Sequence, residues 1–108
     1  MPAVQLDGKT IRNWRDFHRV SQVAFGFPGF YGHNMDAWID CLSTLRDDDG
    51  MSRFTLGPDE TLRIELLHTD FLRRQAPEIL DALLDCAAAV NERYAENGEK
   101  PALAVLLR

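Results

Sequence analysis

Two aspartates, Asp36 and Asp40, stand four positions apart in a segment with helical character, so their carboxylates share one helix face. Two like charges at this spacing cost roughly a few tenths of a kcal/mol unless another group offsets them. No Lys or Arg lies three or four positions from either aspartate. Asp36 lies in the first turn, where the helix dipole favours a carboxylate, whereas Asp40 lies beyond the reach of that field. Asp40 is therefore the side chain whose placement most needs a partner.

A loop dense in aromatic side chains, with Phe30 and Tyr31 at its centre, comes directly before this helix. Acidic groups beside exposed aromatic anchors are typical of a protein-binding surface directed at a basic site. The same residues also fit a plain alternative, a solvated helix face with a few surface aromatics. The residue types alone leave both interpretations open.

Catalytic and metal-binding interpretations have weaker support. Asp36 and Asp40 resemble a general acid/base pair, but a charge-rich helix face predicts neither the pocket nor the tuned pKa that this role needs. His33 with the two aspartates makes a conceivable metal site, although chance proximity of such residues is far more frequent. Ser43 has no neighbouring base, and His18 is isolated and expected at the surface of its helix. The sequence therefore predicts no enzyme, no cofactor and no metal site.

Three apolar segments that must position these residues predict strands, over residues 3–6, 61–68 and 102–107. The last of them is almost continuously apolar, as expected for a strand covered on both faces. Strands separated by helices favour a parallel sheet reached by right-handed crossovers. We therefore expect an α/β fold in one domain, residues 1–108, with a small three-stranded parallel sheet packed with about four helices.

The helices follow capping signals and carry apolar stripes. They are expected after Thr10 or Asn13, after Asn34, near Thr69 and at Pro77. The inward residues are expected to be Trp14, Phe17, Val20, Val23 and Ala24 in the first helix, Met35, Trp38, Leu42 and Leu45 in the second, and Ile79, Leu80, Leu83, Leu84, Ala87 and Val90 in the last. Residues 47–58, rich in Asp, Gly and Pro, predict an exposed loop.

Composition and charge limit the classes of partner. The chain has 108 residues and a formal net charge of −5, which disfavours direct nucleic-acid binding and suits a basic protein partner. Cys41 and Cys86 make no metal or redox pattern, so buried free thiols are expected. We see no signal peptide and no apolar run of about 20 residues that could cross a membrane. The expected location is the cytoplasm.

Residues 30–42 resemble the signature of the barstar family: a pair of aromatics, Gly, any residue, Asn, an apolar residue, Asp-Ala, two bulky apolar positions and Asp-Cys-Leu. The resemblance extends more weakly over residues 4–18 and the final strand. It implies a three-stranded parallel sheet with helices, and an intracellular inhibitor, usually monomeric, of a secreted, basic, barnase-type microbial ribonuclease.

The resemblance also implies roles for individual residues. Asp40 would be the central anchor, accepting hydrogen bonds from arginine and histidine where a substrate phosphate sits, and Asp36 the second acidic contact. Phe30 and Tyr31 would pack over the rim of the enzyme site. The remaining candidate contacts are Gly32, which permits close backbone approach, Asn34, which caps first and contacts second, and Ile39 and Ser43 on the outer side of the helix.

Some positions depart from the signature. The order Trp38-Ile39 places the larger ring in the core and gives Ile39 the exposed position. The family's later acidic contacts come from the last helix, where Glu92 and Glu96 are candidates and Arg93 lies between them. These changes suggest that the cognate nuclease differs from the one that the family typically inhibits, or that this protein binds that nuclease more weakly. The alternative is a barstar-fold interaction domain whose partner is not a ribonuclease.

Overall fold

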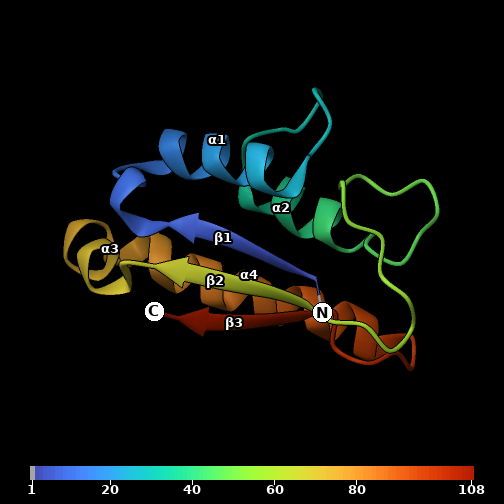
Figure 1. Cartoon of the computed structure of the whole chain (residues 1–108). Coiled ribbons are helices and arrows are strands. Elements are labelled where there is room, and N and C mark those ends of the chain that lie inside the picture. Colours follow the sequence, from blue (N-terminus) through green and yellow to red (C-terminus); the bar gives the residue numbers. More distant parts are fainter. Residues whose placement is uncertain (1) are drawn as a thin grey trace.

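Three parallel strands form one sheet in the computed structural model, which describes residues 2–108 (Figure 1). They are β1 (Ala3–Asp7), β2 (Leu62–Leu67) and β3 (Leu103–Leu107), hydrogen-bonded in the order β1-β2-β3. Val4 lies opposite Ile64, and Ile64 lies opposite Val105. The predicted three-stranded parallel sheet is confirmed.

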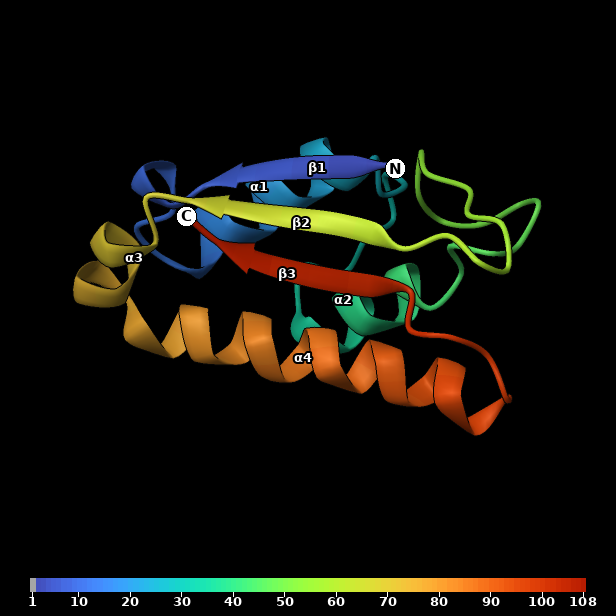
Figure 2. The same ribbon diagram turned by 60° about the horizontal axis from the view of Figure 1, so that its bottom comes forward.

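Four α-helices and one short 3₁₀ helix accompany the sheet. They are the 3₁₀ helix η1 (Gly8–Thr10) and the α-helices α1 (Trp14–Phe25), α2 (Met35–Leu42), α3 (Thr69–Gln75) and α4 (Pro77–Glu96). Figure 1 shows α4 behind β2 and β3, and Figure 2 shows α1 and α2 behind the strands; α3 lies at the end where the strands terminate. The predicted number of helices is confirmed.

The helices cover only one face of the sheet. Along β2, Ile64 and Leu66 are fully buried while Arg63 and Glu65, which point the other way, remain partly accessible. The prediction that the last strand is covered on both faces is therefore wrong. β3 is an edge strand, and its Ala104 is exposed on the uncovered face.

Trp38 of α2 lies at the centre of the core and is fully buried, as predicted. Its ring meets Phe25 edge-on at a centroid distance of 6.0 Å, and its indole Nε1 donates to Ser21 Oγ at 3.3 Å. A buried indole N–H normally needs such an acceptor. The contacts of Trp38 therefore join α2 to α1 and fix the side of α2 that faces outward.

Two asparagines begin the helices that lead into and follow the aromatic loop. Asn13 Oδ1 accepts from the backbone N of Asp16 at 2.9 Å, and Asn34 Oδ1 accepts from that of Ala37 at 2.8 Å. These bonds satisfy donors that a helix start leaves without a partner. Asn13 rather than Thr10 is therefore the cap of α1.

The buried stripes of α1 and α4 differ from the expected ones, and Trp14, expected to face inward, is 38% exposed. In α1, Phe17, Ser21 and Phe25 face the core, and Val23 is 76% exposed on the opposite side. Their four-residue spacing places these three on one face, and the hydroxyl of Ser21 belongs there because it accepts from the buried indole. In α4, Leu84 lies at the boundary with solvent rather than inside.

The connection between α2 and β2 is packed against the protein, so the prediction of an exposed loop over residues 47–58 is wrong in part. Leu56 is buried, and Phe54 lies against the core. The Arg46 guanidinium donates to the carbonyls of Gly57 at 3.2 Å, Glu60 at 2.9 Å and Lys100 at 2.7 Å. The acidic tip, residues 47–49, remains exposed, as do Arg53, Thr55 and Pro58.

Candidate functional site

Tyr31 anchors the aromatic loop from below. Its side chain is buried, and its hydroxyl lies 2.6 Å from His18 Nδ1, which comes from α1. Its ring also lies 4.8 Å from that of Phe27. The expectation that Tyr31 is an exposed aromatic is therefore wrong, as is the placement of His18 at the surface. Both rings turn inward because each hydrogen-bonding group satisfies the other.

Burial shifts the titration of both partners. Loss of hydration raises the pKa of Tyr31, so the phenol stays protonated. Loss of hydration lowers the pKa of His18, and the nearby His33 adds to this shift. The pair is therefore neutral at physiological pH, and it holds the loop without a buried charge.

Phe30, the other aromatic residue of the loop, points into solvent and is 76% exposed. The loop then passes through Gly32, which is exposed, and His33, which adopts a left-handed conformation at φ 53°. Asn34 Nδ2 donates back to the Gly32 carbonyl at 3.2 Å. The cap of α2 thus also fixes the backbone of the loop, and Phe30 is presented from a rigid support.

Asp36 and Asp40 both lie on the exposed side of α2, with Asp36 in its first turn. Met35 and Ile39 are half-buried and rest against the core. The expectation that Ile39 occupies an exposed position is therefore only partly met, because the helix lies close enough to the core to cover much of its side chain. The exposed surface of α2 consists mainly of its two carboxylates.

Asp40 has an ion-pair partner that the sequence analysis missed. Arg93 Nη1, from α4, lies 2.8 Å from Asp40 Oδ1 and 3.4 Å from Ser43 Oγ. Ser43 in turn donates to the Ile39 carbonyl at 2.6 Å. The pair joins residues 53 positions apart, so no spacing rule within a helix could have found it. The only signal in the sequence is a basic residue between two glutamates of the last helix.

Phe30 and Asp40 line the same small groove. Its volume is about 290 Å³, and its lining residues are Phe30, Tyr31, Gly32, Ala37, Asp40, Cys41 and Met51. Met51 comes from the connection after α2 and was not predicted. Burial raises the pKa of the Cys41 thiol, with the Asp40 carboxylate adding to the effect, so this free thiol is not activated.

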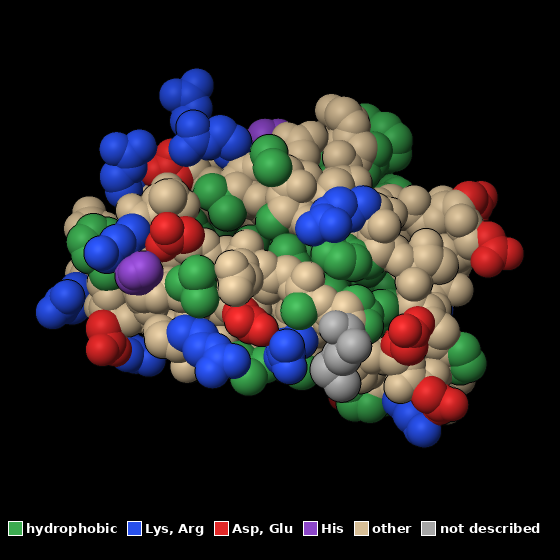
Figure 3. Space-filling view, viewed as in Figure 1, with side chains coloured by type: hydrophobic (Ala, Val, Ile, Leu, Met, Phe, Trp, Pro, Cys, Tyr) green, Lys and Arg blue, Asp and Glu red, His purple; other side chains and the backbone are tan. Residues whose placement is uncertain are grey.

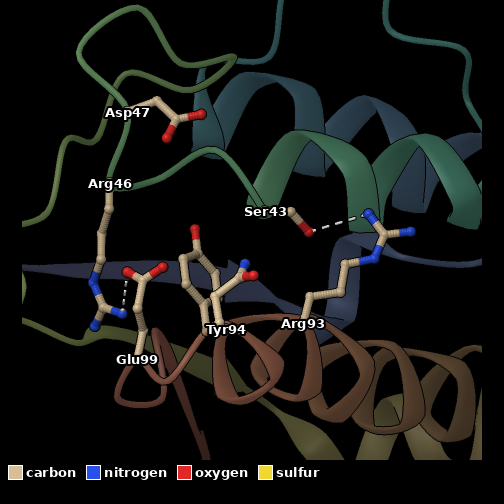
Figure 4. Close-up of a pocket in the computed structure, with 7 residues that line it drawn as sticks. Ser43, Arg46, Asp47, Arg93, Tyr94 and Glu99 are labelled. Atoms are coloured by element: carbon tan, nitrogen blue, oxygen red, sulfur yellow. Dashed lines mark hydrogen bonds and ion pairs between the residues drawn. The ribbon is translucent and has the colours of Figure 1, made fainter.

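A second, polar hollow of about 430 Å³ lies between the end of α2 and the last turns of α4 (Figure 4). Its lining residues are Ser43, Arg46, Asp47, Arg93, Tyr94, Asn97 and Glu99. Tyr94 forms its floor, with its hydroxyl donating to the Leu42 carbonyl at 3.2 Å and accepting from the Leu45 amide at 3.0 Å. Glu92 and Glu96 are exposed on α4 but do not line this hollow.

Charges are unevenly distributed over the molecule. In Figure 3, Lys and Arg side chains gather at the end formed by α3 and the start of α1, where some acidic side chains also lie, and further acidic side chains lie at the opposite end. Within residues 2–108, no three His, Cys, Asp or Glu side chains are grouped so as to hold a metal ion, and His33 forms no such group with the two aspartates of α2. Over the same part of the chain, every helix is too short or too polar to span a bilayer.

An exposed acidic helix and an exposed aromatic ring that line one groove are typical of a small α/β protein that binds another protein. The sequence comparison gives the family. Residues 1–106 match the family model described as Barstar (barnase inhibitor), and the chain belongs to this family. Members of this family are inhibitors and not enzymes, which confirms the expectation of a non-catalytic protein. A comparison with curated proteins gives no match.

Proposed function

We propose that this protein inhibits a basic, barnase-type ribonuclease by covering its active site with the acidic side of α2 and the loop that carries Phe30. Membership of the Barstar (barnase inhibitor) family supports the class of partner. The observation that carries the mechanism is the position of Asp40, which is exposed and lines the same groove as Phe30.

The chemistry of a ribonuclease site explains why carboxylates suit it. Such a site binds a phosphodiester, so it presents cationic donors that a carboxylate can engage through charge-assisted hydrogen bonds. Asp40 offers an outward carboxylate for this purpose, and Asp36 adds a second one on the same side of α2. The net charge of −5 would speed the encounter with a basic enzyme.

The surrounding structure prepares this surface before binding. Tyr31 ties the loop to α1 through His18, and Asn34 ties the loop to the start of α2. Groups held in place before association lose less conformational entropy when the complex forms. Phe30 supports the proposal as an aromatic anchor, since a ring with 76% of its surface accessible has much area to bury against a partner.

The proposal places the protein in the cytoplasm as a monomer, where it would protect cellular RNA from the nuclease. In this arrangement the inhibitor makes no contact with nucleic acid and needs no cofactor, because occlusion alone stops the enzyme. Gly32, Asn34, Ile39 and Ser43 would also contribute to the contact, as expected from the sequence.

Inhibition of a purified barnase-type ribonuclease tests the proposal, with Asp40→Ala compared with Asp70→Ala. Asp70 is a matched control because it is also exposed and paired with an arginine, Arg73, at 2.9 Å, but lies on α3. We expect Asp40→Ala to weaken inhibition about 30-fold or more, as for a residue at the centre of an interface. Asp70→Ala should leave inhibition nearly unchanged.

The salt dependence provides a second readout. Inhibition by the unmodified protein should weaken as ionic strength rises, because oppositely charged surfaces attract less when screened. Equal loss of inhibition in the two variants would contradict a specific role for α2. Absence of inhibition across several barnase-type nucleases would contradict the proposed function and favour a partner that is not a ribonuclease.

A further inference from the structure

The carboxylate proposed as the anchor is already engaged within the protein. Arg93 Nη1 lies 2.8 Å from Asp40 Oδ1, and the side chains are 50% and 59% exposed respectively. Among residues 2–108, Arg93 is the cation that the structure pairs with Asp40, and Ser43 Oγ is its second contact. A partner that approaches Asp40 therefore meets an ion pair and not a lone carboxylate.

We propose that Arg93 competes with the partner's cation for Asp40 and thereby determines which basic sites this protein accepts. The inference rests on the proposed function, because it concerns the same carboxylate. It assigns to α4 a role opposite to the acidic one expected for Glu92 and Glu96, namely to limit the binding of basic surfaces.

Electrostatics gives Arg93 two separate effects on binding. It neutralises part of the charge on Asp40, so the partner's cation gains less from the same carboxylate. It also places a positive charge within one ion-pair distance of the point that a basic site must approach, which is unfavourable for binding. Neither effect changes the free energy of unfolding much, because an exposed ion pair contributes little to stability.

The geometry leaves room for a partner to share or displace Arg93. Asp40 Oδ1 accepts from Arg93, and no hydrogen bond within the described chain engages Asp40 Oδ2. Arg93 also lines the polar hollow beside α2, where Asp47 and Glu99 provide further carboxylates (Figure 4). A nuclease could bind despite the competition from Arg93 in two ways. It could place a donor at Asp40 Oδ2, or it could offer an acceptor to the Arg93 guanidinium. A site with cations alone would be disfavoured.

The test measures the affinity of a barnase-type ribonuclease for the unmodified protein, Arg93→Gln and Arg73→Gln. Arg73 is the matched control, because it forms an exposed ion pair of 2.9 Å with Asp70 on α3, at the far end of the molecule (Figure 1). Both variants change the net charge equally. We expect Arg93→Gln to bind about three- to tenfold more tightly at low ionic strength, and Arg73→Gln to change affinity less than about twofold.

A double-mutant cycle with Asp40→Ala isolates the pair. In the Asp40→Ala background, the gain from Arg93→Gln should fall to less than half of its value in the unmodified protein. A nuclease that binds Arg93→Gln but not the unmodified protein would also support the inference.

Arg93→Gln that binds no more tightly than Arg73→Gln, or more weakly than the unmodified protein, would overturn the inference and leave the proposed function in place. Binding by none of the variants would instead overturn the proposed function and the inference with it. Circular dichroism and thermal unfolding of each variant exclude misfolding as the cause of any loss.

Discussion

The hydroxyl of Tyr31 and Nδ1 of His18 lie 2.6 Å apart, and both side chains are buried beneath the loop that exposes Phe30. This bond links α1 to the loop that precedes α2, so the position of the candidate binding surface depends on a neutral polar pair in the interior. The protonation state of this pair can be changed by pH, and His18 and Tyr31 can each be substituted separately.

The stability of the protein should fall on mild acidification because of His18. Burial lowers the pKa of His18 below its ordinary value of 6.5, so the unfolded chain binds a proton at a higher pH than the folded one. Stability is therefore complete above about pH 6.5 and is lost as the pH falls toward the lowered pKa of the folded state. Urea unfolding between about pH 8 and about pH 5 should show a decreasing midpoint. The His18→Gln variant should show a smaller decrease, and equal slopes would contradict the assignment.

Tyr31→Phe should mainly affect stability, whereas Phe30→Ala should mainly affect binding. Tyr31→Phe removes the partner of a buried imidazole, so we expect a loss of about 1–3 kcal/mol in the free energy of unfolding. Phe30→Ala changes an exposed ring, so stability should remain within about 0.5 kcal/mol while ribonuclease binding weakens. Chemical denaturation and binding of the nuclease, measured on the same preparations, check both results. Strong destabilisation by Phe30→Ala would mean that its ring packs on the protein.

Trp38→Ala should destabilise the fold, and it should affect binding only as a result of that destabilisation. The indole is fully buried and donates to Ser21, so truncation leaves a large cavity and an unsatisfied hydroxyl partner. We expect a loss of about 3–5 kcal/mol, a large part of the stability of a domain of this size. Asp40→Ala provides the contrast, with little change in the unfolding midpoint. A folded Trp38→Ala protein with normal stability would show that the outward side of α2 is wrongly assigned.

Arg46→Met should loosen the connection between α2 and β2. The Arg46 guanidinium is nearly buried and donates to the carbonyls of Gly57, Glu60 and Lys100, of which the Gly57 carbonyl also accepts from the Glu60 amide at 3.1 Å. We expect a loss of about 2–3 kcal/mol by thermal unfolding, together with faster amide exchange in residues 47–60. Arg73→Met serves as the control, since Arg73 is exposed and, among residues 2–108, its ion-pair partner is its helix neighbour Asp70.

Local patterns account for the parts of the structure that the sequence predicted well. Asn34 begins α2, and Trp38 lies in the core, because capping and helical periodicity involve residues only a few positions apart. The strands were found to within one residue or two for the same reason. The exposure of Asp36 and Asp40 follows from the side of α2 that Trp38 buries.

Contacts between distant segments account for what the sequence analysis missed. Tyr31 turns inward because His18, 13 positions earlier, provides a hydrogen-bond partner. Arg93 reaches Asp40 across 53 positions, and Arg46 reaches Lys100 across 54. Neither periodicity nor residue type identifies these pairs, since each depends on how two helices or loops are juxtaposed in space. The candidate binding surface is therefore less predictable than the fold that carries it.

The helices cover one face of the sheet and leave the other face open. The molecule therefore has two regions that differ in how freely their residues can be substituted. On its open face, Gln5, Glu65 and Leu106 lie side by side across the three strands, with Glu65 also held by Arg63 at 3.0 Å. These side chains take no part in the buried core, and they belong to a surface separate from α2. Substitutions there can alter solubility or provide an attachment point for a label or a solid support while the acidic helix remains accessible. Under the proposed function, the open face of the sheet is free to diverge, whereas the partner constrains the side of the molecule that carries α2.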